Sequence, residues 1–381
     1  MRAVAAIGIG QTKVEEQWDR SLKEIAGEAI FAAVQDCGIS HIDGVYVGNM
    51  MSASANSQQN LGAYLTDWIG AKNISALRLE SACSSGSAAF RAAFLAVASG
   101  EVDIALAVGV EKMTDSPSNE ITSALATAAS ADWEADQGLS FVALNALLMQ
   151  RYMHETGWKH RDFANFSINA HANAVHNPFA RFHMPITEDK FVNAAMICDP
   201  INLMDSSPIG DGAAAIVLVP AEMVSGKVIR VVGSSAATDT IAVHSRKDPT
   251  WLSAAESSSK KAYAQAGIGP QDIDFFEYHD AFTIMAALSL EANGFTERGK
   301  GPQMALDGAI RLDGSLPVAT MGGLKARGHP VGATGMYQLV EVIQQLRGTA
   351  GENQLEKARI GMAQNIGGSG SNIITHILRN D

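Results

Sequence analysis

The chain has 381 residues, 47% of them hydrophobic and 18% charged, which argues against a disordered chain or a coiled coil and predicts two or three domains or one large compound fold. The net charge of −12 argues against nucleic-acid binding as the main role, because neutralising phosphates requires a basic surface. Neither a secretory signal nor a membrane span is expected, since the first apolar run ends by Gln11 and the stretch 90–110 contains charged residues. Cys37, Cys83 and Cys198 are too widely spaced for a disulfide framework and suggest a reducing cytoplasm.

Short apolar runs alternate with helical patterns along the first part of the chain. Strands are expected at 4–9, 42–47, 76–80 and 103–110, and helices at 21–37, 60–69 and 84–99. Such alternation is typical of βαβ units and predicts an α/β fold with a largely parallel sheet.

The same pattern returns in the last part of the chain. Strands are expected at 228–232, 273–278 and 359–364, and helices at 251–266, 283–293 and 334–346. The segment 36–43, with its glycine between a helix and a strand, aligns with 265–274. Helix, glycine and strand in this order are common in α/β proteins, so it is the matching register that indicates two similar halves.

A different segment, 114–205, separates the two halves and is expected to be a loop domain over the active face. It is helical at 139–155 and 162–174, and a strand at 210–219 then returns to the first sheet. The predicted domains are therefore a first half (1–113 plus 206–226), the loop domain (114–205) and a second half (227–381). The loop domain holds five histidines, but none forms an HxH or HExxH pattern and no cysteine is beside them, so no metal site is expected.

Cys83 lies between an expected strand and an Ala-rich helix that begins at Ser84. Free N–H groups and the positive dipole end of a helix stabilise a thiolate, so this setting predicts a lowered pKa and a nucleophile. A buried structural cysteine is the alternative interpretation.

A glycine-rich loop at 322–335 contains His329 followed by Pro330. Five glycines in fourteen residues indicate a loop whose backbone approaches a ligand, and His329 is suited to act as a base toward a thiol. A dinucleotide-binding GxGxxG loop is disfavoured, because the spacing differs and no acidic residue follows about twenty positions later.

Two more sites follow expected strands, where ligands of α/β sheets gather. His279 lies in the sequence EYHDAF at 277–282 and could donate a hydrogen bond to a developing oxyanion, although a core histidine with satisfied hydrogen bonds is the alternative. The glycine-rich sequence NIGGSG at 365–370 could supply a backbone oxyanion donor.

Together these motifs resemble the thiolase superfamily over nearly the whole chain. The resemblance rests on the cysteine elbow, the His-Asp-Ala-Phe box, the GHPVGATG loop, the final glycine-rich turn and the sequence SPIGDGAA at 207–214. The His-Asp box and the sequence NPFA at 177–180 look like the branch of sterol-carrier-protein-type and archaeal acetoacetyl-CoA thiolases.

The resemblance implies two α/β halves in α-β-α-β-α layers and a loop domain that grips coenzyme A. It implies that Cys83 is acylated by an acyl-CoA, and that His329 deprotonates Cys83 and helps to form an oxyanion hole. His279 would take the place of the Asn that orients an oxyanion-hole water. The backbone N–H groups of Cys83 and Gly367 would form the other oxyanion hole. The further substrate-binding candidates implied by the motifs are Ser207, Gly323 and Gly368. Coenzyme A thioesters would be the substrates, with no bound cofactor.

The chain departs from the family pattern where thiolases usually carry a second, acid/base cysteine: those positions are Asn365 and Ala281. The remaining Cys-His-His set is similar to that of some ketoacyl synthases. The leading hypothesis is an acetyl-CoA C-acetyltransferase. The alternatives are an acyltransferase with a non-CoA carbon acceptor, and an aldolase-type or non-catalytic subunit of a complex, against which the retained Cys83 argues.

The resemblance also implies that this chain assembles with other protein subunits. Family members are homodimers or homotetramers, and archaeal thiolases of this type resemble partners of a small zinc-binding OB-fold protein and a hydroxymethylglutaryl-CoA synthase. That connection suggests lipid metabolism and the mevalonate route to isoprenoids.

Overall fold

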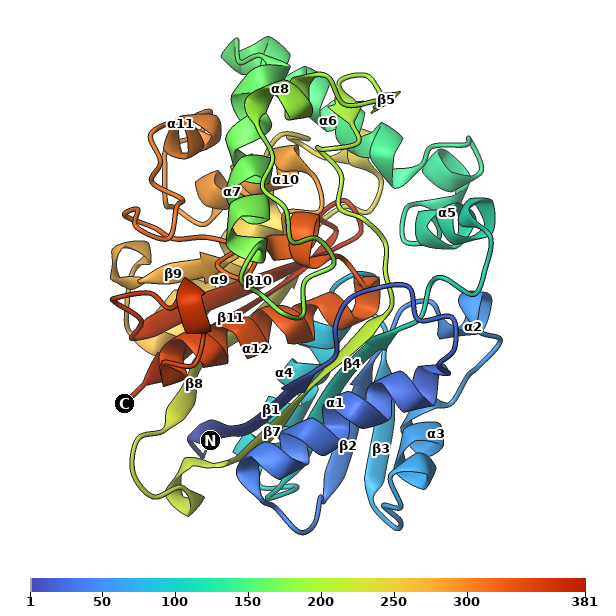
Figure 1. Ribbon diagram of the computed structural model, residues 1–381, viewed down its shortest axis with the longest axis vertical. Helices are drawn as coiled ribbons and strands as arrows, with labels where there is room; N and C mark the ends of the chain where they lie inside the picture. Colours follow the sequence, from blue (N-terminus) through green and yellow to red (C-terminus); the bar gives the residue numbers. More distant parts are fainter. Residues whose placement is uncertain (1) are drawn as a thin grey trace.

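The computed structural model describes residues 2–381, and in that range the main sheet has nine strands in the order β3-β2-β4-β7-β1-β8-β11-β10-β9 (Figure 1). Its strands are β1 Val4–Gln11, β2 Gly44–Gly48, β3 Ser75–Leu79, β4 Ala105–Glu111, β7 Gly212–Pro220, β8 Ile229–Thr238, β9 Phe275–Glu277, β10 Ile360–Gly367 and β11 Asn372–Asn380. A small two-stranded sheet pairs β5, Met196–Cys198, with β6, Ile201–Asn202.

The sheet is mixed, so the prediction of a largely parallel sheet is wrong. Only the pairs β2–β3, β2–β4 and β9–β10 are parallel within residues 2–381. The central strands β7, β1, β8 and β11 run antiparallel to their neighbours. Strand β11 was not expected from the sequence; it follows the glycine-rich turn after β10 directly and returns as a hairpin. Hairpin returns reverse strand direction, whereas helical crossovers keep it.

Two similar halves meet where β1 pairs with β8 through only two residue pairs, Ala5 with Arg230 and Ala6 with Ile229. The repeat is confirmed: α1, Leu22–Cys37, ends at Gly38 with φ of 68°, and α9, Ser253–Ala266, ends at Gly267 with φ of 69°. Both glycines adopt the left-handed conformation that ends a helix without a Cβ clash. In each half the next strand joins the sheet as a parallel neighbour.

The helices form three layers around the two halves of the sheet, as the resemblance implied. On one side α1 and α3, Leu61–Trp68, cover the first half, and on the other α9 packs on β8 and β11 beside α10, Thr283–Ala292. Between the halves lie α4, Ser85–Ser99, and α12, Thr334–Arg347, and each contacts strands of both halves. All three layers are visible in Figure 1.

The segment between β4 and β7 sits above the sheet and carries most of the green part of the chain in Figure 1. Its helices are α5 Ser118–Ala126, η1 Ala131–Ala135, α6 Phe141–Thr156, η2 His160–Phe163, α7 Ala164–Ala174 and α8 Glu188–Val192. The remaining short helices are α2 Ser52–Ala55, η3 Ala221–Met223, η4 Val243–Ser245, η5 Pro270–Asp272, α11 Gly301–Leu306, η6 Gly323–Arg327, η7 Val331–Ala333 and η8 Gly351–Asn353. Helix α7 packs on η6, so this segment touches the glycine-rich loop. None of the helices in residues 2–381 has the length and apolar character needed to cross a bilayer.

A buried carboxylate at the end of β4 ties the two halves together. Glu111 accepts hydrogen bonds at 2.9 Å from the side chain of Asn49 and from the backbone N–H groups of Met50, Met51 and Gly332. Gly332 approaches so closely that a Cβ there would lie 2.4 Å from the carboxylate. One side chain thus fixes the loop after β2 against the glycine-rich loop of the second half.

The variant Glu111→Gln should lower the free energy of unfolding by about 3 kcal/mol, because an amide NH2 group would face N–H donors where an oxygen now accepts. Urea denaturation measures the change. The control is Glu101→Gln, at an exposed site, which removes the same charge and should stay within about 0.5 kcal/mol of the parent. Equal losses in the two variants would contradict this role of Glu111.

Candidate active site

Cys83 lies in a tight turn between β3 and α4. Ala82 has φ of 51°, a conformation that is strained for a residue with a Cβ and that turns the chain sharply before Cys83. The Ser85 hydroxyl closes the turn: it accepts from the Ser81 N–H at 2.9 Å and donates to the Ala82 carbonyl at 2.6 Å. Cys83 is therefore held just before the first turn of α4, where the sequence predicted it.

The predicted lowering of the Cys83 pKa is wrong for this structure. Burial, and after it the nearby Glu111 carboxylate, raise the pKa of the thiol to about 12. The backbone N–H groups of Cys83 and Gly368 act in the opposite direction but do not outweigh burial. The thiol is therefore protonated at neutral pH, and a base must remove its proton before it can attack.

Two histidines stand beside the thiol. The sulfur of Cys83 and one ring nitrogen each of His279 and His329 all lie within 4.8 Å of one another, and all three residues are buried. The imidazole rings meet edge to face, with centroids 5.1 Å apart. Burial lowers the pKa of His279 to about 3, and burial together with His279 lowers the pKa of His329, so both rings are neutral. Neutral imidazoles can accept a thiol proton.

Each imidazole has its Nδ1 atom engaged by a polar side chain. The amide nitrogen of Asn365, in β10, lies 2.8 Å from Nδ1 of His279. The hydroxyl of Thr334, the first residue of α12, lies 2.7 Å from Nδ1 of His329. These contacts leave the Nε2 atoms as the ring nitrogens free to face Cys83.

The other predicted motifs converge on the same place. The His329 N–H donates to the Pro208 carbonyl at 3.1 Å, and the Ser207 N–H donates to the Ala281 carbonyl at 2.8 Å. The motif at 207–214 thereby joins the glycine-rich loop to the His-Asp box. Gly367 packs against Ser81, whose carbonyl would lie 2.5 Å from a Cβ at Gly367. Gly368, the next residue, is the one whose N–H acts on the Cys83 thiol.

Buried charges lie behind the two histidines, on the loop that contains Gly323. The Arg327 guanidinium pairs with Glu341 at 2.8 Å, and its positive charge contributes to the lowered pKa of both His279 and His329. Asp280 accepts the Leu324 N–H at 2.8 Å, and a Cβ at Gly323 would lie 2.6 Å from the Asp280 carboxylate. These contacts place Gly323 against Asp280, the residue after His279, and fix the backbone that leads to His329.

The remaining thiols and the loop-domain histidines do not join this cluster. Cys198 lies in β5 of the small sheet, and Cys37 ends α1 with its thiol 3.2 Å from the Ala33 carbonyl. Two of the loop-domain histidines pair with acids elsewhere: His160 with Asp205 at 2.7 Å and His176 with Glu352 at 3.1 Å. In the described part of the chain, the group whose spacing could hold a metal ion is the Cys83, His279 and His329 set itself.

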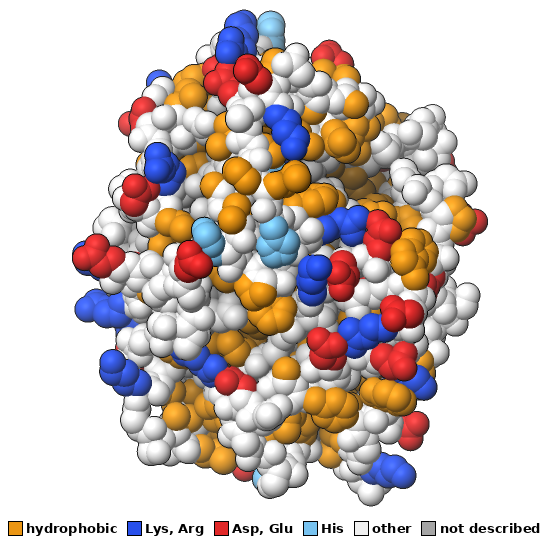
Figure 2. Space-filling model, viewed as in Figure 1, with side chains coloured by type: hydrophobic (Ala, Val, Ile, Leu, Met, Phe, Trp, Pro, Cys, Tyr) orange, Lys and Arg blue, Asp and Glu red, His pale blue; other side chains and the backbone are white. Residues whose placement is uncertain are grey.

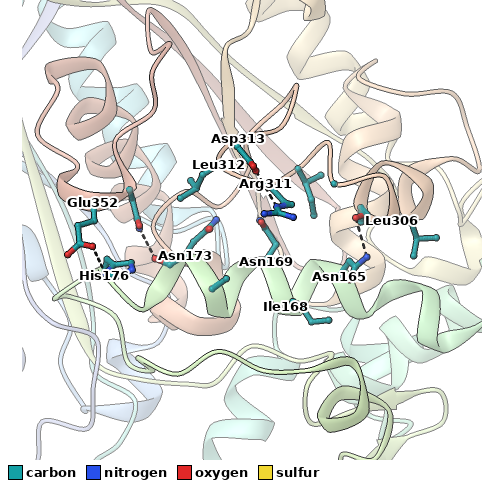
Figure 3. A pocket seen from close by; sticks show the side chains of 15 residues that line it. Asn165, Ile168, Asn169, Asn173, His176, Leu306, Arg311, Leu312, Asp313 and Glu352 are labelled. Atoms are coloured by element: carbon teal, nitrogen blue, oxygen red, sulfur yellow. Dashed lines mark hydrogen bonds and ion pairs between the residues drawn. The ribbon is translucent and has the colours of Figure 1, made fainter.

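A cleft of about 570 Å³ lies elsewhere, between α7 and the chain around α11. In Figure 3, Asn169 and Asn173 point from α7 toward Arg311 and Leu312 on the opposite wall. The cleft is lined by none of the three reactive side chains, so it is distinct from the site around Cys83.

Sequence reasoning did not identify the supporting roles of three residues at the site: Glu111, Thr334 and Asn365. A single acid closing an otherwise apolar strand was a usable signal for Glu111. Thr334 lay inside the glycine-rich motif, but its contact with His329 depends on the turn of η7. Asn365 meets His279 through the pairing of β9 with β10, which no local pattern shows.

Comparison with known proteins identifies the family of this chain. The sequence model of the thiolase N-terminal domain matches residues 3–222, and that of the thiolase C-terminal domain-like family matches 235–380. An acetyl-CoA acetyltransferase of Methanothermobacter thermautotrophicus is 44% identical over 99% of both chains. The benzoylsuccinyl-CoA thiolase subunit BbsB of Thauera aromatica is 33% identical over 96% of this chain and 95% of that one.

A solved structure named Ltp2-ChsH2(DUF35) aldolase superposes with a TM-score of 0.86 at 25% identity, covering 100% of this chain and 98% of the other. The two thiolase domain matches span almost the whole chain, and they contain the reactive cysteine and both histidines. The chain therefore belongs to the thiolase family.

Proposed function

We propose that this thiolase is an acetyl-CoA C-acetyltransferase, which joins two acetyl-CoA molecules into acetoacetyl-CoA or cleaves acetoacetyl-CoA with coenzyme A. The observation that carries the proposal is the Cys83 thiol within 4.8 Å of two neutral imidazoles, in a chain matched end to end by a relative of that name. The thiol supplies the nucleophile, and the imidazoles supply the proton transfers that Claisen chemistry requires.

The reaction has two balanced steps. In the first, His329 takes the Cys83 proton, the thiolate attacks the acetyl-CoA carbonyl, and coenzyme A leaves as its thiol with that proton. In the second, a histidine removes a proton from the methyl group of another acetyl-CoA. The resulting carbanion attacks the acetyl group on Cys83, and the Cys83 thiolate leaves and recovers the proton. Backbone N–H groups of Cys83 and Gly367, with the neighbouring Gly368, would stabilise the oxyanion on the acyl-cysteine.

An assay of thiolysis and condensation tests the proposal. Purified protein should cleave acetoacetyl-CoA in the presence of coenzyme A and should form it from acetyl-CoA, with longer 3-ketoacyl-CoAs compared in parallel. Acylation of Cys83 without either reaction would instead indicate transfer to a non-CoA carbon acceptor. An aldolase role would show cleavage without acylation, and the retained Cys83 argues against it.

Coenzyme A is expected to lie against the loop domain, 114–205, whose Met and His side chains offer adaptable contacts. Ser207, Gly323 and Gly368 remain the proposed substrate-binding residues. Ser207 contacts Ala281 and Gly323 lies against Asp280, both close to His279 in the chain, and the Gly368 N–H acts on the Cys83 thiol. No resident cofactor is proposed.

A protein partner is also proposed, in line with the resemblance to archaeal thiolases that act with a zinc-binding OB-fold protein and a hydroxymethylglutaryl-CoA synthase. The loop domain exposes an apolar patch around α8 and the small sheet: Met184, Val192, Met196, Ile197 and Leu203 are each at least 42% exposed. Figure 2 shows apolar side chains gathered on that part of the surface. We place the enzyme in the cytoplasm and in isoprenoid precursor synthesis on the same resemblance.

Self-association is proposed through the free edge of the sheet. Strand β3 ends the strand order on one side, so one row of its backbone N–H and C=O groups is available to a second copy. Leu77 in the middle of β3 is 55% exposed. An apolar side chain on an open edge is the feature that a dimer would cover.

If Cys83 is the nucleophile, incubation with acetyl-CoA should leave one acetyl group on Cys83, detected by mass spectrometry of peptides. The double variant Cys37→Ala/Cys198→Ala should keep most of its condensation rate, because neither thiol reaches the reactive set. A label on Cys37 or Cys198 would refute the assignment. So would a double variant that is acylated normally yet forms no carbon–carbon bond.

Removal of the imidazole in His329→Ala should slow both Cys83 acylation and turnover by about 100-fold or more, because the raised pKa of the thiol makes a base necessary. Stopped-flow release of coenzyme A measures the acylation step. The exposed His41, outside the loop domain, offers the matched control, since His41→Ala should leave both rates unchanged. An unaltered acylation rate in His329→Ala would exclude the proposed role.

The variant Leu77→Lys should weaken the dimer, because it places a charge at the covered edge of β3. Sedimentation equilibrium at several concentrations should show a shift toward monomer. Met223→Lys is the control: Met223 is 57% exposed but lies in η3, outside the sheet edge. The edge would not be the interface if both variants associated like the parent.

A further inference from the structure

Asn365 occupies the position where the family pattern would place a second cysteine, and its contacts are those of a buried hydrogen-bond donor. Its side chain is fully buried in β10, with the amide nitrogen 2.8 Å from His279 Nδ1 and the amide oxygen without a hydrogen-bond partner. Gly335 in α12 makes room for this amide, since a Cβ there would lie 2.3 Å from the Asn365 oxygen.

The orientation of the amide decides which tautomer His279 adopts. With the nitrogen toward the ring, Asn365 donates, so Nδ1 of His279 accepts and the ring hydrogen is on Nε2. The reverse orientation would leave a buried NH2 group with no acceptor in place of a buried oxygen with no donor. Unpaired buried donors are rarer in proteins than under-satisfied carbonyl oxygens, so the donating orientation is the favoured one.

Thr334 has the opposite effect on the second ring. Its hydroxyl lies 2.7 Å from His329 Nδ1 and is also placed to donate to the Pro330 carbonyl at 3.4 Å. A hydroxyl has one hydrogen, so a hydroxyl that donates to Pro330 accepts from the histidine. His329 then carries its hydrogen on Nδ1 and has a bare Nε2.

We propose that Asn365 and Thr334 are positioning residues that hold the two histidines in opposite tautomers, so that His279 is the hydrogen-bond donor and His329 the only base of the reaction. The proposal rests on the proposed thiolase function. Two chains of hydrogen bonds follow. In the first, Asn365 donates to His279. In the second, the Cys83 thiol donates to His329, His329 donates to the Thr334 hydroxyl, and this hydroxyl donates to the Pro330 carbonyl.

This order explains how the site works without a second cysteine. His329 gives the first proton to the departing coenzyme A thiolate and is neutral again when the second acetyl-CoA arrives. Its Nε2 then removes the methyl proton, while the Nε2 hydrogen of His279 stabilises the negative charge that develops on the thioester oxygen. Formation of the carbon–carbon bond releases the Cys83 thiolate, which takes the proton back from His329. Burial and the nearby Arg327 keep the pKa of His279 low, so this ring stays a neutral donor.

The variant Asn365→Asp tests the proposal, because a carboxylate accepts and would draw the His279 hydrogen to Nδ1. Two rates are compared: exchange of labelled coenzyme A into acetyl-CoA, which needs only Cys83 acylation, and condensation to acetoacetyl-CoA. Asn365→Asp should lower the condensation rate by about 100-fold and the exchange rate far less. His279→Ala should show the same difference between the two rates. Thr334→Val is the contrast variant; it removes the acceptor of His329 and should lower both rates together.

Nitrogen NMR of the parent protein with labelled histidine reports the two tautomers directly. This test does not require any variant to fold. The proposal expects a bare Nδ1 on His279 and a bare Nε2 on His329. A hydrogen on His279 Nδ1 in the parent would overturn it, as would equal loss of exchange and condensation in Asn365→Asp. A parent protein that neither exchanges coenzyme A nor condenses would refute the proposed function instead, and the NMR result would still decide the tautomers.

Discussion

The structure depends on acidic side chains that are buried at the ends of strands and accept the N–H groups of neighbouring loops. Glu111 at the end of β4 holds the backbone of residues 50, 51 and 332, and Asp211 accepts from the N–H groups of Gln17, Met113 and Thr114. Glu277 at the end of β9 accepts from the N–H and hydroxyl of Thr320. A buried loop leaves N–H groups without water, and the oxygens of a buried acidic side chain satisfy several of them at once. The loops that carry the reactive residues can therefore lie inside the protein rather than on its surface.

Close packing between the halves is the second requirement, and small residues meet it. A Cβ at Gly86 in α4 would lie 2.9 Å from the Gly332 carbonyl, and a Cβ at Gly109 in β4 would lie 2.9 Å from the backbone of Ala333. Helices α4 and α12 thus approach the sheet and each other near the site. The thiol and the imidazoles come from opposite halves, so their spacing is set by this contact and not by either half alone.

Much of the fold and of the reactive set could be predicted from the sequence, because both have local signals. The glycines that end α1 and α9 indicated the repeat, and Cys83, His279 and His329 each stood in a recognisable motif. Strand direction could not be predicted, since β7 takes its direction from the distant strands β1 and β4, and the hairpin strand β11 was not expected at all. The pKa of Cys83 was predicted with the wrong sign because helix position is readable from sequence while burial is not. The partners of His279 and His329 depend on cross-strand register, which a single sequence does not contain.

The order β3-β2-β4-β7-β1 has a consequence for how the chain folds as it is synthesised. Strand β7 lies between β4 and β1, so the strands of the first half cannot form one continuous sheet until residue 220 has left the ribosome. The segment 114–205 is synthesised before β7. It must therefore be compact, or lie away from the sheet, for as long as β1 has no β7 to pair with. The second half is synthesised next, and its sheet is complete only when β11 pairs with both β8 and β10. An insertion at this point takes part in the folding of the first half, and an unfolded insertion would delay closure of the sheet that carries the nucleophile.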